Sequence, residues 1–316
     1  MTRAQFALVG FGVVAVVGAG AAQSNSRLNP TIDLLEANKP VFGMYTPRAP
    51  RGRAGAPPAE PKTPADLAKE ALSFDAGDIL FSGDMERNFD TGYAGFSALV
   101  AELAKHPNRM KHPLVVKAPK ISTDPVKVAE NIGKQLDLGV TTVVFVDVES
   151  AQEVQQGLAA MRFTSKGGTR AETVGSAPAY WGVSEKEYRE KADLWPLNPN
   201  GELVNWTIVE SKEGLSKLRE IAAVKGIGVL FPGAGTLRGV FTTVNQEGQR
   251  VFDEEGWENA IQQVLSACKE FKIACGYPAT EKDIEMRMKQ GFSVFIINWG
   301  EAGFRTVDIG RKAGGR

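Results

Sequence analysis

The sequence predicts one α/β domain, a single (β/α)₈ TIM barrel, and three observations lead to this prediction. Short apolar runs rich in β-branched residues alternate with segments of helical spacing through most of the chain. Counted along the sequence, the runs that qualify as buried strands number eight. A chain of 316 residues, 43% of them hydrophobic, is long enough to bury one large core. Alternation of strand and helix in one chain is what a closed parallel barrel requires.

The predicted elements follow one another in a regular order. The strands are expected at residues 39–45, 79–82, 114–117, 142–146, 205–209, 227–231, 273–276 and 293–297. The helices are expected at residues 29–38, 64–73, 94–105, 125–138, 151–161, 256–271 and 280–289, with another between Ser211 and Gly226. Ser211 is a suitable N-cap for that helix, and Gly226 is a suitable glycine to end it.

The stretch from Trp206 to Leu237 contains two of these strands, joined by a helix. Parallel strands connected in this way have their carboxyl ends on the same face of the sheet. We therefore expect Glu210, which ends the first strand, to lie beside the glycine turn at residues 233–236, which ends the second. An acidic side chain beside exposed backbone amides is a candidate oxyanion or metal site.

The first residues of the chain have the pattern of an export signal. Arg3 precedes an apolar core at residues 6–17, and Ala19-Gly20-Ala21 has the small residues of a cleavage site. A transmembrane anchor is the alternative, but the apolar core is shorter than the roughly 20 residues that span a bilayer. We therefore expect a signal peptide at residues 1–22, a barrel domain at 23–316, and a periplasmic or secreted mature protein without a membrane span.

Charge excludes one class of partner. Acidic and basic residues balance at 37 each, so the chain has no net field that would attract nucleic acid or a membrane surface. We expect a small anionic molecule as substrate and no nucleic-acid partner.

Cys268 and Cys275 are the two cysteines of the chain. An oxidising compartment would permit a disulfide between them. However, Cys268 belongs to the apolar face of the predicted helix 256–271, and Cys275 to the strand that follows. Because a helix packed on a sheet usually holds such residues farther apart than the about 7 Å that a disulfide spans, we expect two buried thiols.

Two long segments depart from the alternation of strand and helix. Residues 47–62 are rich in proline, glycine and arginine and cannot form a regular element. They are either a cationic flap over an anionic substrate, carrying Arg48, Arg51 and Arg53, or a disordered insertion. Residues 163–203 are longer than an ordinary connection, and connections of this length usually have a function. Subunit contact and substrate contact are both open for them, with subunit contact favoured.

Five stretches of the mature chain carry a family resemblance. They are residues 35–43 (LEANKPVFG), 113–119 (PLVVKAP), 136–153 (from LDLGV to ESAQE), 161–170 (from MRF to GGTR) and 210–213 (ESKE). In their order and spacing they resemble the HpcH/HpaI aldolase family, metal-dependent pyruvate-type aldolases on a (β/α)₈ barrel. The resemblance implies carbon–carbon lyase activity and a homo-oligomer. The carboxy-terminal tail, residues 303–316, has little apolar content of its own.

The family pattern places a general base, a histidine, at the end of the second strand in the sequence Asp-x-Glu-His. This chain has DMER at residues 84–87, so the base is not histidine; a shift of two residues puts Glu86 in the histidine position. His106 and His112 precede the third strand and belong to the opposite face of the barrel. We expect Glu86 or Asp84 to move protons and Arg87 to hold the substrate. A local ion-pair network is the alternative.

Glu210 matches a metal-binding carboxylate of the family. The second carboxylate is missing, because residues 233–237 (GAGTL) replace the family's Gly-Pro-x-Asp-Leu and put Thr236 in the position of the aspartate. Mg²⁺ and Mn²⁺ commonly keep one or two carboxylates and several waters. The implied divalent metal is therefore bound more weakly, or helped by Asp84 or Glu86, or lost.

The resemblance also implies how a substrate would be held. Lys117 takes the position of the family's substrate-binding arginine and can neutralise a carboxylate or enolate as a point charge. The remaining substrate-binding positions form the glycine turn, Gly233, Ala234, Gly235 and Thr236. The expected function is an exported aldolase-like carbon–carbon lyase acting on a 2-oxo acid or related anionic carbonyl compound through a metal-stabilised enolate. The alternative is a barrel that has lost this chemistry and binds a ligand or catalyses a different lyase or isomerase step.

Overall fold

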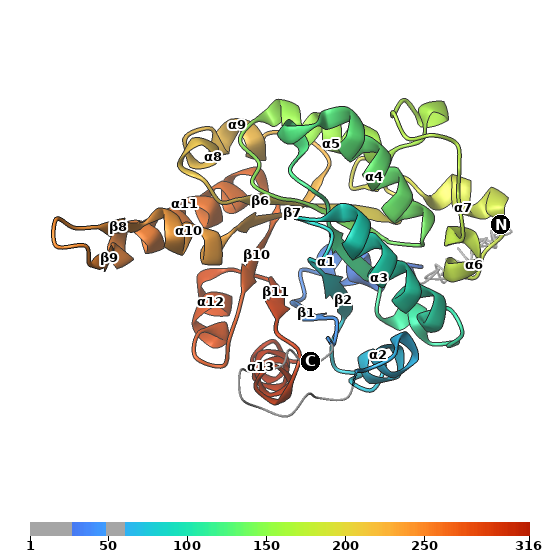
Figure 1. The fold of residues 1–316 in the computed structure, drawn as a ribbon, viewed down its shortest axis with the longest axis horizontal. Coiled ribbons are helices and arrows are strands. Elements are labelled where there is room, and N and C mark those ends of the chain that lie inside the picture. Colours follow the sequence, from blue (N-terminus) through green and yellow to red (C-terminus); the bar gives the residue numbers. More distant parts are fainter. Residues whose placement is uncertain (1–26, 49–60) are drawn as a thin grey trace, which may run out of the picture.

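Eight parallel strands close into a barrel in the computed structural model, which describes residues 27–48 and 61–316. The barrel strands are β1 (Val41–Tyr45), β2 (Ile79–Ser82), β3 (Leu114–Lys117), β4 (Thr142–Phe145), β6 (Leu203–Val209), β7 (Ile227–Pro232), β10 (Ala274–Pro278) and β11 (Val294–Ile297). Each pairs in parallel with the next in this series, and β11 pairs with β1 to close the ring. The predicted (β/α)₈ barrel is confirmed (Figure 1).

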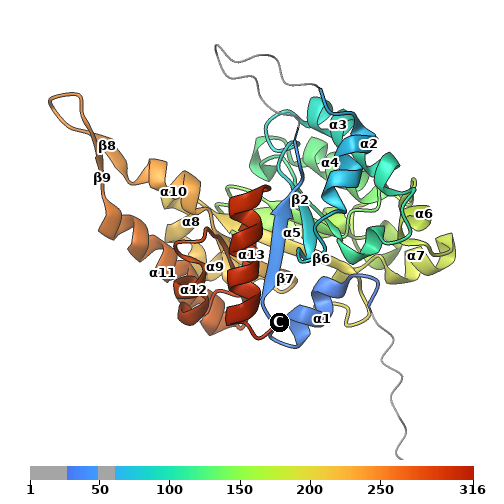
Figure 2. The ribbon, with the colours of Figure 1, turned by 90° about the horizontal axis from the view of Figure 1, so that it is seen from below.

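Helices surround the barrel, as Figures 1 and 2 show. They are α2 (Pro64–Ala71), α3 (Phe89–Leu103), α4 (Pro125–Asp137), α5 (Ala151–Met161), α8 (Lys212–Ser216), α9 (Leu218–Ala222), α10 (Ala234–Val240), α11 (Glu254–Phe271), α12 (Ile284–Gln290) and α13 (Glu301–Ala313). Short 3₁₀ turns lie at Arg109–Lys111, Ile121–Thr123 and Thr164–Lys166. We call the carboxyl ends of the strands the mouth of the barrel and their amino ends the foot.

Apolar side chains fill the inside of the barrel. Trp206 is fully buried there, with its ring 6.4 Å from that of Phe81 and 5.5 Å from that of Phe231. At the foot, α1 (Pro30–Glu36) adds Ile32 and Leu35 to the same cluster. The helix therefore covers the foot of the barrel, and the mouth is left for a site.

Several helices differ from their predicted bounds, and in two of them the structure shows a local reason. α3 begins at Phe89, ahead of the predicted residue 94, because the Asn88 side chain caps it by accepting a hydrogen bond from the Thr91 N–H at 3.2 Å. The helix predicted after Ser211 is divided into α8 and α9 at Lys217, whose φ of −107° and ψ of 13° are not helical. Ser211 itself is confirmed as an N-cap, since its side chain accepts from the Gly214 N–H.

Helix α13 was not predicted. Its buried face consists of Gly303, Thr306, Val307 and Gly310, so small residues stand where helical periodicity normally shows large apolar ones. A Cβ atom at Gly310 would clash with the Phe42 ring on β1. Figure 2 shows α13 beside β1, and this close approach depends on the missing side chains.

A two-stranded hairpin between α10 and α11 was also not predicted. Its strands are β8 (Thr242–Val244) and β9 (Arg250–Phe252), which pair antiparallel. Figure 1 shows the hairpin projecting from the barrel. Val244 and Val251 are 67% and 49% exposed, so this short element lacks the alternating buried face that reveals a strand in a sequence.

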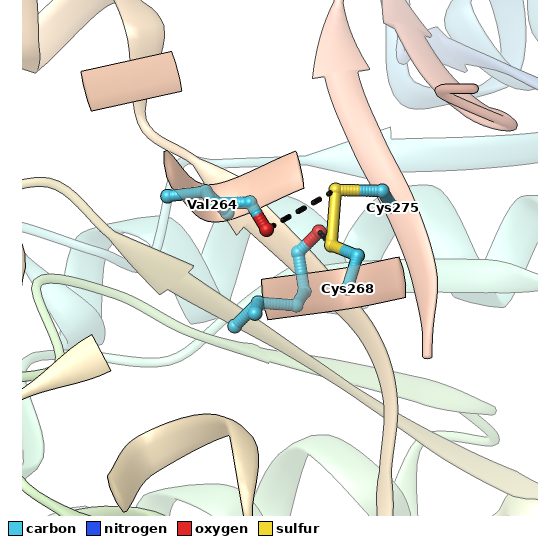
Figure 3. Close-up of a disulfide and its surroundings, with 4 residues drawn as sticks. Val264, Cys268 and Cys275 are labelled. Carbon is cyan, nitrogen blue, oxygen red and sulfur yellow. Dashed lines mark hydrogen bonds between the residues drawn. A yellow bond between two sulfur atoms is a disulfide. The ribbon is translucent and has the colours of Figure 1, made fainter. Parts of the chain in front are cut away.

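The prediction of two free thiols is wrong, because Cys268 and Cys275 form a disulfide (Figure 3). Their Cα atoms are only 5.6 Å apart. The reason is local: α11 ends at Lys272 in the left-handed conformation, with φ of 56°, and the chain reverses at once into β10. Cys275 therefore lies under the last turn of the helix that holds Cys268.

The long connection at residues 163–203 packs against the foot half of the barrel. It contains α6 (Ala177–Trp181), α7 (Glu185–Lys191) and β5 (Leu194–Trp195), which pairs with the start of β6. The Trp181 indole N–H donates to the Gly139 carbonyl at 2.9 Å. None of its residues lines the mouth cavity described below, and subunit contact stays a prediction.

Three predictions concern residues outside the described ranges. These are the signal peptide at 1–22, and Arg51 and Arg53 of the flap, which fall within residues 49–60. Among the described helices, none combines the length and the apolar character needed to cross a membrane.

Candidate active site at the barrel mouth

A cavity of about 200 Å³ lies at the mouth of the barrel. All eight barrel strands contribute to its wall, which is mostly apolar and aromatic, with a few polar groups. The strand residues that line it are Tyr45, Phe81, Lys117, Val144, Trp206, Ile208, Phe231, Pro232, Pro278 and Ile296, and Glu210 and residues 233–236 complete the wall. An apolar cavity with a few convergent polar groups is the usual form of a small-molecule site.

Glu210 is the buried acid of this cavity. It is 5% exposed, and its Oε1 accepts a hydrogen bond from the Asp147 N–H at 3.1 Å. Burial raises the pKa of Glu210, while the hydrogen bond from the Thr236 hydroxyl and the charge of Lys117 act in the opposite direction. Gly233 lies so close that a Cβ atom there would clash with the carboxylate. The predicted proximity of Glu210 and residues 233–236 is confirmed.

The backbone N–H of Asp147 holds the Glu210 carboxylate from outside the cavity. Asp147 has a φ of 46°, unusual for a residue other than glycine, and this turn presents its N–H to Glu210. Lys120 donates to the carboxylates of Asp147 and Glu149, at 2.7 Å in each case. The hydrogen bond from Lys120 lowers the pKa of Glu149. Lys120 and its two acids do not line the cavity.

Lys117 and Glu86 form the second functional pair. The Lys117 Nζ donates to the Glu86 Oε2 at 2.8 Å, and the two side chains are 16% and 28% exposed. The backbone of Lys117 is fixed at the end of β3, where its carbonyl accepts from the Gln135 side chain. Of the two partners, Lys117 lines the cavity and Glu86 reaches it through Lys117.

Asp84 and Arg87 lie apart from this group. Asp84 is bound by Arg48 at 2.6 Å, with both side chains 45% exposed, and by the Ser82 hydroxyl at 3.2 Å. Arg87 is exposed, and neither residue lines the cavity. Arg48, the one flap arginine in the described residues, therefore pairs with Asp84 at the rim. The structure brings together Glu86, Lys117, Glu210 and residues 233–236, and leaves Asp84 and Arg87 outside.

The turn at residues 233–236 is the start of a helix. Gly233 is the N-cap of α10 and supplies no capping side chain. The first backbone amides of α10 therefore lie in the cavity wall without a side-chain cap. This agrees with the expected exposed amides, although the segment is helical from Ala234 onward.

The histidines lie away from the site, as their position before β3 predicted. His112 is buried at the foot, where its Nδ1 donates to the Gly77 carbonyl at 2.8 Å. His106 lies in the same connection before β3. A general base at the mouth must therefore be another residue.

Sequence reasoning missed the apolar and aromatic wall of the cavity, including Tyr45 and Trp206, whose rings carry polar groups. Burial raises the pKa of Tyr45, and the charge of Lys117 opposes this. The Trp206 indole nitrogen is buried and has no hydrogen-bond partner among the described residues. Trp206 had a usable signal: it lies four residues before Glu210, and residues spaced by two in a strand face the same side. Tyr45 is the last residue of β1, and its position there is the corresponding signal.

The residues present do not fit the divalent metal that the family resemblance implies. Glu210 is a single carboxylate that already accepts hydrogen bonds from Asp147 and Thr236. Within residues 27–48 and 61–316, no three histidine, cysteine, aspartate or glutamate side chains are grouped to hold a metal. A cation beside Glu210 would also meet the charge of Lys117, which acts on that carboxylate. The donors are too few and too weakly negative for a tight Mg²⁺ or Mn²⁺ site.

The fold and the cavity define a class of protein: a parallel barrel with an enzyme-like site at the carboxyl ends of its strands. Within this class, the chain belongs to the HpcH/HpaI aldolase/citrate lyase family, whose model matches residues 95–304. The predicted resemblance is therefore confirmed.

Individual relatives agree with this assignment. The chain is 26% identical over 211 residues to the hydroxypyruvate/pyruvate aldolase of Paraburkholderia phytofirmans, covering 66% of this chain and 69% of that enzyme. In fold it is similar to an HpcH/HpaI aldolase/citrate lyase family protein of Burkholderia cenocepacia J2315, with a TM-score of 0.64, 20% identity, and coverage of 90% and 97%. It is also similar in fold to a citrate lyase beta subunit from M. tuberculosis, complexed with oxaloacetate and magnesium, with a TM-score of 0.51, 15% identity, and coverage of 89% and 99%.

Proposed function

We propose that the protein is a carbon–carbon lyase that acts on a small 2-oxo acid at the mouth cavity. The observation that carries this proposal is the position of Lys117, which lines an otherwise mostly apolar cavity and pairs with Glu86. A single ammonium group in an apolar cavity favours a small anion, because the low polarity of the wall strengthens their attraction. The aldolase name of the relative from Paraburkholderia phytofirmans supports a 2-oxo acid as that anion.

The cavity residues suit the two tasks of such a lyase. Lys117 and the first amides of α10 are placed to attract the carboxylate or the developing enolate oxygen. Glu86 is placed to move a proton, because it already shares a hydrogen bond with the cation that would hold the substrate. Trp206 offers a buried indole N–H with no protein partner among the described residues. Asp84 and Arg87, predicted for proton transfer and substrate binding, have no such role in this proposal.

The test is turnover by the purified protein with a panel of 2-oxo acids and aldehydes, analysed for aldol, retro-aldol and decarboxylation products. The assay is run with added Mg²⁺ or Mn²⁺ and, separately, after EDTA treatment. We expect turnover that EDTA leaves largely unchanged, because the donors around Glu210 do not fit a metal. Turnover that EDTA abolishes and Mg²⁺ restores would support a metal-stabilised enolate instead. If no product forms while a control family enzyme works, the lyase proposal fails.

A second candidate function is ligand binding, or a different lyase or isomerase step, without aldolase chemistry. The observation that favours it is the pairing of Lys117 with Glu86, which can hold an anion without any reaction. Calorimetric titration with 2-oxo acids distinguishes the two functions. Binding that survives EDTA and the Glu210→Ala substitution, without turnover, would favour this second function.

We also propose that the protein is exported to the periplasm or secreted. Residues 1–22 support this by their charge and apolar pattern, and the disulfide supports it independently, because such bridges persist in oxidising compartments. The measurement is the intact mass of protein recovered from the periplasm and medium of the expressing cell. We expect a mature chain that begins near Ala22; full-length protein confined to the cytoplasm would contradict export.

Assembly into a homo-oligomer stays a proposal that rests on the family. The exposed Val244 and Val251 of the hairpin are available for contact with a second copy. Light scattering at micromolar concentration tests it, and a purely monomeric protein would remove it.

A further inference from the structure

Lys117 is the single amine among the described residues that line the mouth cavity. It ends β3, and its side chain is 16% exposed. The Lys117 Cδ packs over Gly83, 3.6 Å from the point where a Cβ atom on that glycine would lie. The Nζ lies 2.8 Å from the Glu86 Oε2, and Lys117 forms part of the same cavity wall as Tyr45 and Glu210. An amine in this setting is a candidate nucleophile for a carbonyl group.

We propose that Lys117 forms an imine with the 2-oxo acid and that this imine stabilises the carbanion of the lyase reaction. The inference rests on the proposed function and names how its site works. A protonated imine withdraws electrons from the neighbouring carbon and so stabilises a carbanion there without a metal. The chain needs such an electron acceptor, because the position of the second family carboxylate is held by Thr236 and no group of three metal-ligating side chains occurs among the described residues.

The protons balance through Glu86, whose Oε2 lies 2.8 Å from the Lys117 Nζ. Glu86 accepts the ammonium proton, the free amine attacks the C2 carbonyl carbon, and the proton passes to the carbonyl oxygen. Glu86 then removes a second proton from nitrogen and gives it to the hydroxyl group, which leaves as water while the C=N bond forms. The sum is one ammonium and one ketone giving one iminium and one water.

Carbon–carbon cleavage uses the same pair. Glu86 accepts the proton of the substrate's C4 hydroxyl, the C3–C4 bond breaks, and its electrons move into the iminium to give an enamine and an aldehyde. Glu86 returns the proton to C3, and water hydrolyses the resulting iminium to pyruvate and the ammonium form of Lys117. No oxidant, reductant or further reactant is consumed.

Lys120 provides a matched control within the same segment. It lies three residues beyond Lys117 and also binds carboxylates at 2.7 Å, but it does not line the cavity. If the cavity makes an amine reactive, only Lys117 of these two lysines should react. If any basic amine reacts, Lys120 should react as well.

The experiment is reductive trapping of the full purified chain with pyruvate and sodium cyanoborohydride, in EDTA. Intact mass and peptide mapping are expected to show one reduced pyruvyl adduct per chain, on the peptide that contains Lys117. Lys120→Arg is expected to trap like the wild type, Lys117→Arg not at all, and Glu86→Gln about 100-fold more slowly. If Lys117→Arg does not fold, the position of the adduct in the wild-type map still decides the question.

The failure of this inference is distinguishable from the failure of the proposed function. No adduct in an enzyme that turns over 2-oxo acids overturns the imine alone. An adduct spread over surface lysines, or equal in Lys117→Arg and the wild type, also overturns it. Absence of turnover and of 2-oxo acid binding overturns the proposed function and the inference together.

Discussion

At the mouth of the barrel, Lys117 lies between a cavity and a half-buried glutamate, whereas at the foot Asp78 is enclosed by arginines and backbone. The Asp78 carboxylate accepts from the Phe42 N–H at 2.8 Å and from two nitrogens of Arg316 at 2.7 and 2.8 Å. The Asp78 carboxylate is thus bound by groups of the protein itself. Among the described residues, in contrast, the Lys117 ammonium pairs with Glu86 alone, and Lys117 lines a cavity.

This difference shows that ion pairs alone do not mark a functional site in this barrel. Pairs of similar length occur at both ends, but Lys117 lines the mouth cavity, whereas Asp78 and Arg316 do not. In barrels of this type, the mouth carries the chemistry and the foot carries stability. We therefore expect substitutions at the mouth to change activity, and substitutions at the foot to change the free energy of unfolding.

The largest expected effect is the loss of activity on changing Lys117 to methionine. Removal of the cavity cation should lower kcat/KM by about 10²- to 10⁴-fold, because the cation stabilises charge that develops in the transition state. Lys120→Met is the matched control and should change kcat/KM only slightly. Steady-state kinetics of both variants, with melting temperatures to confirm folding, measure the contrast. An equal loss of kcat/KM in the two variants would show that the position of Lys117 in the cavity wall makes no difference to activity.

The second effect is on stability and concerns Asp78 at the foot. Asp78→Ala should cost about 3 kcal/mol, because it leaves Arg316 and the Phe42 N–H without their nearly buried acceptor. Asp84→Ala at the exposed rim should cost less than about 1 kcal/mol, since surface ion pairs contribute little. Denaturant midpoints measure both values. A smaller loss for Asp78→Ala than for Asp84→Ala would reverse the assignment of the two ends.

The third effect is the contribution of the disulfide, also at the foot. Replacing Cys268 and Cys275 together by alanine should cost about 2–3 kcal/mol, mainly because the bridge closes a short loop in the unfolded chain. Calorimetry of the variant and of the wild type, each with and without a reducing agent, isolates the bridge. The reducing agent should lower the melting temperature of the wild type only, and kcat should be unchanged in both.

The fold was largely predictable from the sequence because barrel strands are buried on both faces. Residues 142–145 (TVVF) form an unbroken apolar and β-branched run, and every residue of that strand is buried. Helix α13 and the disulfide were not predictable in this way. The first depends on glycines that allow close contact with β1, and the second on one left-handed residue, Lys272, at the end of α11.

The candidate site was predictable only in part. Glu210 and residues 233–236 were placed correctly, because strand ends in a parallel barrel meet at one face. Asp84 and Arg87 were expected beside them but lie outside the cavity. They follow β2 in a turn, and the direction of a side chain in a turn is set by backbone geometry that spacing does not encode. Trp206 was taken for core because an apolar residue inside a strand has the same pattern whether it packs or lines a cavity.

The smallest expected effect is a pH dependence of stability at the foot, from His112. Burial lowers the pKa of His112 below its ordinary value of 6.5, although the Gly77 hydrogen bond and Asp75 act to raise it. The unfolded chain therefore takes up a proton at a higher pH than the folded protein does. The contribution of His112 to stability is complete well above pH 6.5 and is lost as the pH falls from 6.5 through the lowered folded-state pKa.

His112→Gln tests this, because glutamine keeps a donor for the Gly77 carbonyl but does not titrate. Melting temperatures are measured over a pH series that crosses 6.5. The advantage of the wild type over His112→Gln should shrink toward acid pH. His106→Gln, in the same connection, is measured alongside as the control variant. The pH profile of kcat should be the same for all three proteins, since neither histidine is at the mouth. A kcat profile altered by His112→Gln would mean that the foot takes part in the chemistry. The assignment of activity to the mouth and of stability to the foot would then be wrong.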